Sequence, residues 1–134
     1  MIEVVTGLLF VALGCALGGM ARFFVSGWVA RRIGETFPWG TLIVNLSGAF
    51  VIGVFGALAS TGRGWFATPG PWLFAVTGFL GCYTTVSSFS LQTVTLARQG
   101  ETLRAACNVM FTLVLGLVVV ALGYASGRWW SVLP

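Results

Sequence analysis

The chain has 134 residues, of which 57% are hydrophobic and only 7% are charged, and it contains no histidine. A soluble domain carries about 25% charged residues, so this composition excludes an ordinary water-soluble protein and indicates an integral membrane protein. The net charge of +4 comes entirely from an excess of arginine over glutamate. With so little polar surface, this excess marks loops that flank a membrane rather than a nucleic-acid interface.

Four apolar segments follow one another, and each is near the ~20 residues that a helix needs to cross a ~30 Å hydrocarbon core. The expected spans are about 4–25, 38–60, 71–97 and 103–123, and they form a single all-α transmembrane domain over residues 1–134. Between the first two spans, Trp28 to Glu35 is short and carries two arginines. We expect an interfacial turn or loop there.

The first span carries a glycine stripe at Gly7, Gly14 and Gly18 on one helical face. Such a stripe lets a neighbouring backbone approach closely. Arg22 follows at the end of this span and has two interpretations. It is either an interfacial arginine that reaches lipid headgroups, or a structural or vestibule arginine that attracts anions to a pore mouth.

Polar side chains share one face of the second span and one face of the fourth. Thr41, Asn45 and Gly48 lie at helical spacing on the second span, and Asn108 and Thr112 do so on the fourth. Burying an amide without partners costs about a few kcal/mol. Asn45 is therefore expected either to join helices by hydrogen bonds or to donate its NH₂ group to a passing anion, and the same choice applies to Asn108 and Thr112. Because three spans each turn a polar stripe inward, we expect a continuous track of donors that includes Asn45, Asn108 and Thr112.

The third span is unlike the others because hydroxyl groups are concentrated in its middle, just after Gly78 and Gly81. The cluster consists of Thr84, Thr85, Ser87, Ser88 and Ser90, with Phe89 among them. This pattern predicts that the helix breaks and restarts in the middle of the membrane, where irregular backbone is tolerated only beside a cavity or inside protein. The new helix N-terminus would present unpaired N–H groups and a partial positive charge, which is an anion or ion site.

The arginines give only a weak orientation signal. With four spans, Arg63 and Arg128 lie on one side of the membrane, and four arginines lie on the other: Arg31, Arg32, Arg98 and Arg104. A strongly oriented protein shows a steeper bias. The sequence thus permits insertion in both directions and antiparallel pairing of the chain with itself.

Several classes of function lack their usual residues. Glu3, Glu35 and Glu101 all lie at span ends or in loops, whereas a proton-coupled pump or a cation exporter ordinarily needs a carboxylate inside the membrane. A small multidrug exporter, the main alternative, would need one in the first span. The sequence has no nucleophile–base pair and no metal-ligand cluster, which argues against an enzyme. A non-transporting membrane scaffold is the third alternative.

Three motifs together resemble the Fluc (CrcB) fluoride channels across essentially the whole chain. They are Gly18-Gly19-x-x-Arg22, Gly40-Thr41-x-x-x-Asn45-x-x-Gly48, and Gly78-Phe79-x-Gly81-x-x-Thr84-Thr85-x-Ser87-Ser88-Phe89-Ser90. The resemblance implies a dual-topology antiparallel homodimer in the cell inner membrane. Such a dimer has two pores that let fluoride leak passively out of the cytoplasm and so confer fluoride resistance.

The resemblance also implies roles for individual residues. Backbone carbonyls of Gly81 and Thr84, with their symmetry mates, would hold a structural Na⁺ at the dimer centre. Asn45, Ser87 and Ser88 would belong to the polar ion track, and the ring edge of Phe89 would meet fluoride. Arg22 would lie near the vestibule.

The chain departs from the family pattern at a few positions. Val86 stands where the family usually has a phenylalanine, which removes one of two ring edges, and Cys82 stands in place of a glycine. On the fourth span, Asn108 and Thr112 stand where a tyrosine and a serine are expected. These changes leave open whether the chain pairs with itself or with a second, related chain.

Overall fold

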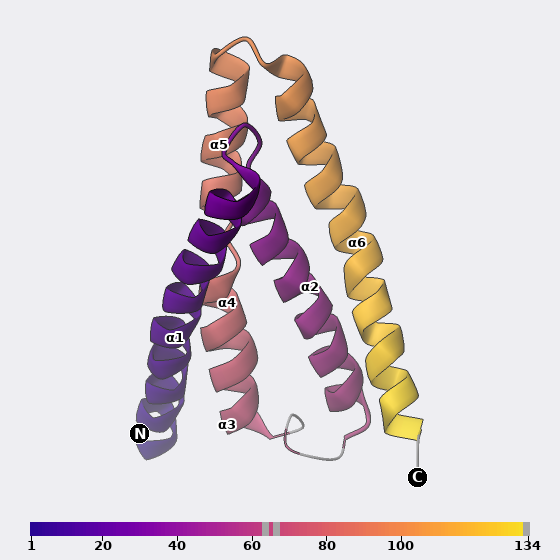
Figure 1. Ribbon diagram of the computed structural model, residues 1–134. Helices are drawn as coiled ribbons and strands as arrows, with labels where there is room; N and C mark the ends of the chain where they lie inside the picture. Colours follow the sequence, from indigo (N-terminus) through magenta and orange to yellow (C-terminus); the bar gives the residue numbers. More distant parts are fainter. Residues whose placement is uncertain (63–64, 66–67, 133–134) are drawn as a thin grey trace.

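The structure, a computed structural model, describes residues 1–62, 65 and 68–132. Its helices are α1 (Ile2–Ile33), α2 (Trp39–Ser60), a third span made of α3 (Pro69–Trp72), η2 (Leu73–Leu80), α4 (Gly81–Tyr83) and α5 (Val86–Arg98), and α6 (Thr102–Val132) (Figure 1). In this part of the chain, four helical stretches are long and apolar enough to cross a membrane.

The helices form two packed pairs, and a contact between α1 and α2 joins the pairs. α2 packs along α6, while α1 packs along η2 and α4 and also contacts α2. α5 continues beyond the break and contacts α6. Both termini lie at one end of the molecule, and the α5–α6 connection lies at the other (Figure 1). This is the arrangement that four successive crossings produce.

Glycines allow these pairs to approach at the level of the backbone. A side chain at Gly14 or Gly18 of α1 would collide with backbone atoms of Phe79, and one at Gly7 would touch Leu73. The glycine stripe predicted on the first span is therefore confirmed as a helix contact. On the other pair, a side chain at Gly123 would collide with backbone atoms of α2. Small residues at such contacts favour helix association in membranes.

The turn expected from Trp28 to Glu35 is wrong for Trp28 to Ile33, which belong to α1. α1 continues to Ile33 and ends at Gly34, whose φ of 94° suits glycine. Hydropathy marks where a helix leaves the hydrocarbon and not where it ends. Arg31 and Arg32 occupy the last turn, where cations interact favourably with the helix dipole. α6 likewise runs past its apolar segment.

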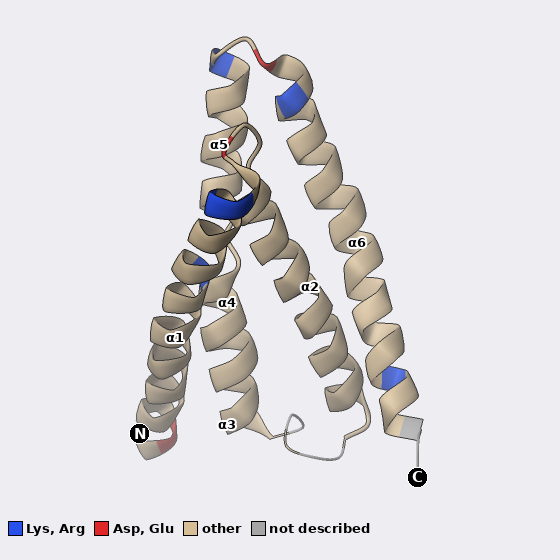
Figure 2. Ribbon diagram, viewed as in Figure 1, with Lys and Arg blue, Asp and Glu red and all other residues tan. Residues whose placement is uncertain are grey.

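Charged residues gather near the ends of the long helices, and most of the spanning surface is uncharged (Figure 2). The α5–α6 connection carries the ion pair between Arg104 and Glu101, 3.3 Å apart. Arg63, which counts toward the weak arginine bias, lies outside the described residues. The pattern of Figure 2 is the one expected of helices whose middle parts lie in lipid.

Candidate functional site at the broken helix

The helix break that the sequence predicts is present, and it lies at the two threonines. Gly81 keeps helical dihedral angles, whereas Thr84 (φ −77°, ψ 159°) and Thr85 (φ −151°, ψ 122°) are extended. α5 starts immediately afterwards at Val86. Upstream of the break, Leu73–Leu80 is wound as a π-helix, a form that is rare and often found at functional sites.

The amide of Asn45 supplies the two hydrogen bonds that Thr85 loses at the break. Its Nδ2 donates to the Thr85 carbonyl (3.0 Å), and the Thr85 N–H donates to its Oδ1 (2.8 Å). Thr85 is only 7% exposed, so water cannot satisfy these groups. Of the two roles expected for Asn45, helix joining is thus observed, although one N–H of the amide remains for another acceptor.

α2 is shaped to receive the break. A side chain at Gly48 would collide with the methyl group of Thr84, so glycine is required for this close approach. Two residues after Asn45, Ser47 is hydrogen-bonded to the Tyr83 hydroxyl (2.8 Å). The predicted polar face of the second span therefore lies against the third span.

The Thr85 hydroxyl caps α5 and organises the two serines that follow. It accepts a hydrogen bond from the Ser88 N–H (3.2 Å) and donates to Ser88 Oγ (3.2 Å), and Ser87 Oγ lies 3.1 Å away. Because Ser88 Oγ accepts this bond, its own hydroxyl proton is available to a ligand. Ser87 points to the exposed surface of the chain.

A cavity of about 260 Å³ lies beside the break, between α1, α2 and the start of α5. We call it the Arg22 cavity, because Arg22 is the charged residue in its lining, which also includes Ser26, Thr41, Thr85 and Ser88. Arg22 forms no ion pair with any described residue. A cation without a carboxylate partner, together with free hydroxyl groups, gives this cavity a positive potential that favours anions.

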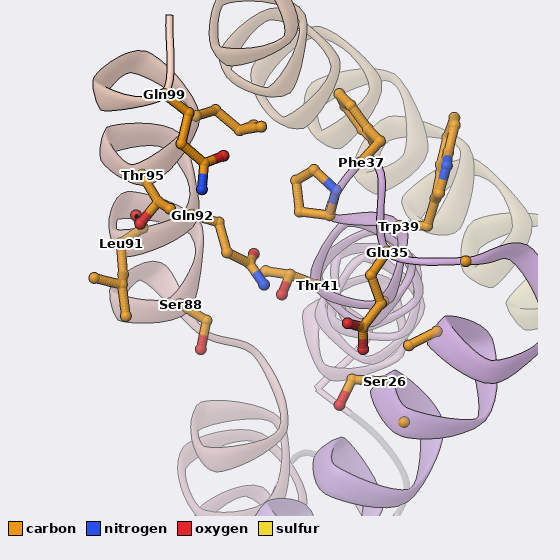
Figure 3. Close-up of a pocket in the computed structure, with 16 residues that line it drawn as sticks. Ser26, Glu35, Phe37, Trp39, Thr41, Ser88, Leu91, Gln92, Thr95 and Gln99 are labelled. Carbon is orange, nitrogen blue, oxygen red and sulfur yellow. Dashed lines mark hydrogen bonds between the residues drawn. The ribbon is translucent and has the colours of Figure 1, made fainter. Parts of the chain in front are cut away.

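A larger cavity of about 580 Å³ adjoins the first and shares Ser26, Thr41 and Ser88 with it (Figure 3). We call it the Glu35 cavity. One of its walls is a polar stripe along α5, where Ser88, Gln92, Thr95 and Gln99 follow at helical spacing. The opposite wall comes from Glu35 and Phe37 in the α1–α2 connection and from Trp39 at the start of α2 (Figure 3).

Gln92 is a polar residue of this wall that the sequence analysis missed. Its Oε1 is buried without a hydrogen-bond partner among the described residues. A half-turn of the amide exchanges oxygen and NH₂, so Gln92 can present a donor to a ligand in the cavity. The signal that could have revealed it is the i, i+4, i+7, i+11 spacing of the polar residues on α5.

The face of α5 that meets α6 carries a separate polar contact. Asn108 Nδ2 donates to Thr93 Oγ1 (2.8 Å), which in turn donates to the Phe89 carbonyl (2.7 Å). Asn108 is only 2% exposed. Thr112 follows one turn later on α6 and is half-buried. None of these residues lines either cavity.

Comparison with known proteins matches residues 9–124 to the family model described as CrcB-like protein, Camphor Resistance (CrcB). The chain belongs to this family. It is 73% identical to the Fluoride-specific ion channel FluC 2 of Rhodopseudomonas palustris (strain BisB18), over 94% of this chain and 96% of that protein. It is 61% identical to the Fluoride-specific ion channel FluC 2 of Bradyrhizobium diazoefficiens, over 90% of this chain and 88% of that protein.

A more distant relative, the Fluoride-specific ion channel FluC 4 of Brucella abortus biovar 1, is 49% identical over 90% of this chain and 91% of that protein. The resemblance noted in the sequence is thereby confirmed. Together with the four apolar helices, membership of the CrcB family establishes a multi-pass membrane protein.

Within this CrcB chain, the predicted site residues fall into two groups on different faces of α5. Arg22 and Ser88 share the Arg22 cavity, and Asn45 is bonded to its neighbour Thr85. Asn108 and, through its carbonyl, Phe89 lie on the α6 side. One chain does not bring the two groups into one continuous cavity.

Proposed function

We propose that this protein is a fluoride-selective channel that carries fluoride passively out of the cytoplasm and so confers fluoride resistance. The observation that carries the proposal is the Arg22 cavity, where an unpaired cation and the free hydroxyl proton of Ser88 meet beside a broken helix. The names of the CrcB relatives give the ion. Neither cavity lining includes a catalytic set of residues, which favours a conduit over an enzyme.

The donor chemistry suits fluoride, which is small and strongly hydrated. A narrow path must replace the water around such an ion with protein donors, and the donors must hold it weakly enough to release it. Hydroxyl and amide groups do this better than a second guanidinium would. In this proposal Arg22 raises the local anion concentration, and Thr41, Ser88 and Gln92 receive the ion in turn.

The ion would then pass around the start of α5 toward the polar contact between α5 and α6. In this proposal the ring of Phe89 meets the ion there, because the electropositive edge of an aromatic ring can face an anion. Asn45 and Ser87 flank the crossing, and Asn108 and Thr112 continue the track on the far side. Val86, which is 76% exposed, offers no ring edge, so this chain would rely on Phe89 alone.

A second copy of the chain completes the proposed path. Val86, Ser87 and Ser90 at the start of α5 are exposed in one chain although they lie in the middle of a span. A hydroxyl group at such a place favours contact with protein over contact with lipid. The weak arginine bias supports insertion in both directions, and hence an antiparallel dual-topology homodimer in the cell inner membrane.

The residues at the break also fit a structural Na⁺ at the dimer centre. Thr85 N–H donates to Asn45, and Ser88 N–H donates to Thr85 Oγ1. The carbonyls of Gly81 and Thr84 thus lose the donors that an unbroken α-helix would give them. Carbonyls of unwound helices coordinate Na⁺ in membrane proteins. Gly81 and Thr84, each with its counterpart in the partner, would hold the ion and tie the two chains together.

The proposal is tested by efflux from liposomes that contain the purified protein alone, with chloride as the control anion. Rapid fluoride efflux without chloride efflux is expected. Fluoride retention by well-folded protein would contradict a self-sufficient channel, and efflux restored by co-expression with a related chain would instead indicate a heteromeric pair.

The crossing at Phe89 is tested by Phe89→Ile, which keeps an apolar side chain but removes the ring edge. Fluoride efflux is expected to fall to background while the dimer remains assembled in size-exclusion chromatography. Phe24→Ile is the matched control, because Phe24 is 68% exposed on α1 and lines neither cavity. Full efflux from Phe89→Ile would remove the ring edge from the mechanism.

A further inference from the structure

The Glu35 cavity contains a charge of the sign opposite to that of the Arg22 cavity. Glu35 is the charged residue among those that line it, and its carboxylate points into the cavity (Figure 3). The residue is exposed and lies in the α1–α2 connection, so it stands at the water-facing mouth. A carboxylate is unexpected at the mouth of a path for anions, because it repels them.

The neighbouring arginines do not neutralise this carboxylate. Arg32 stacks over the ring of Trp28, with its guanidinium carbon 5.5 Å from the ring centroid. Arg104 pairs with Glu101 (3.3 Å). Neither Arg31 nor Arg98 lines the cavity, and Glu35 has no ion-pair partner among the described residues. Its negative charge therefore acts on whatever enters the cavity.

We propose that Glu35 is a charge filter that lowers the concentration of anions in the cavity and excludes multivalent anions more strongly than monovalent ones. This inference rests on the proposed function, because it concerns access to the same path. The cavity, at about 580 Å³, is large enough to admit sulfate or phosphate. Once inside, such an ion would be drawn toward Arg22 and would obstruct fluoride.

The filter follows from the dependence of the Coulomb energy on ion charge. A unit charge about 6 Å away in a water-like dielectric changes the local concentration of a monovalent ion about threefold. For a dianion the energy doubles, so the same carboxylate changes its concentration about ninefold. Glu35 thus lowers the rate of fluoride flow to some extent and lowers the entry of polyvalent anions more strongly.

The test measures fluoride efflux from liposomes for the unmodified protein and for Glu35→Gln, at sub-saturating fluoride and about 0.1 M monovalent salt, with sulfate added as a blocker. Efflux is expected to rise about threefold in Glu35→Gln. The sulfate concentration for half-block is expected to fall about ninefold. Both effects should shrink at about 1 M salt, where the Debye length is about 3 Å.

Glu101→Gln is the matched control, because it removes the same charge on the same side of the membrane but outside the cavity. Unchanged efflux from Glu35→Gln beside active unmodified protein would overturn the filter and leave the channel intact. An equal rise in fluoride efflux with Glu101→Gln would attribute the effect to general surface charge and would also overturn the filter. Sulfate that blocks no variant would contradict the exclusion of dianions. No efflux from any of the proteins would overturn the proposed function, and the filter with it.

Discussion

The third span and α6 are two ways for a chain to cross the same membrane. α6 is one unbroken helix over Thr102–Val132, whereas the third span is divided into α3, η2, α4 and α5 over Pro69–Arg98. α6 satisfies its backbone groups internally. The third span cannot do so at Thr85, whose N–H and carbonyl are hydrogen-bonded instead to Asn45 on α2.

The difference shows that a helix can open in an apolar environment when a side chain from another helix takes over the backbone hydrogen bonds. An amide is well suited to this task because it carries a donor and an acceptor side by side, as a peptide group does. The break consequently depends on residues of α2, while the continuity of α6 depends on α6 alone. This dependence can be tested by substitutions that act on one span and spare the other.

The largest effect is expected from Asn45→Leu, which removes both hydrogen bonds and leaves the N–H and carbonyl of a buried residue unsatisfied. Each such group costs about 1–3 kcal/mol, so the free energy of unfolding should fall by about 2–6 kcal/mol. Denaturant titration in detergent measures this fall in the free energy of unfolding, and fluoride efflux is measured in parallel. Asn45→Asp keeps the acceptor for Thr85 N–H and loses the donor. A loss in Asn45→Leu below about 0.5 kcal/mol would mean that the amide does not maintain the break.

A smaller effect is expected from Gly48→Ala. The added methyl group would collide with the Thr84 side chain, and overpacking of this kind costs about 1–3 kcal/mol. Gly56→Ala is the control on the same helix, because nothing lies within 4 Å of the position of its new side chain. Thermal unfolding should separate the two variants. Equal midpoints would show that α2 and the break are not closely fitted.

The smallest effect is expected where α5 meets α6. Thr93→Val preserves shape but removes the acceptor for Asn108, and hydrogen bonds between spanning helices are worth about 1 kcal/mol. A double-mutant cycle with Asn108→Leu should give a coupling of about 0.5–1.5 kcal/mol. A coupling of zero would assign the contact between α5 and α6 to apolar packing alone.

Much of this architecture is predictable from hydropathy and residue type. The apolar segments indicate four crossings, because lipid requires long uncharged helices. The hydroxyl cluster after Gly81 indicates the break, and the stripe at Gly14 and Gly18 indicates a close helix contact. These features are local, so a single segment contains the whole signal. The turn expected to begin at Trp28 was wrong, because hydropathy detects the boundary of the hydrocarbon and not the end of the helix.

What the sequence could not provide is the pairing of residues far apart in the chain. The polar face of α2 was evident, but not that the amide of Asn45 would be used by the Thr85 backbone. Asn108 was grouped with Asn45 on the expectation of one shared track, whereas one chain places Asn108 on the α6 side of α5. Gln92 was overlooked because the polar spacing on α5 indicates a ligand-facing wall only once a cavity is known to lie beside it.

The double hydrogen bond between Asn45 and Thr85 has a consequence for control. A gate needs two arrangements of similar energy, but here any closure that rewinds the helix must first give up both bonds to the amide. The break is therefore a stable part of this fold. In the proposed channel, rewinding of the third span would be a costly way to stop the ion, and the ion gradient would set the direction of flow.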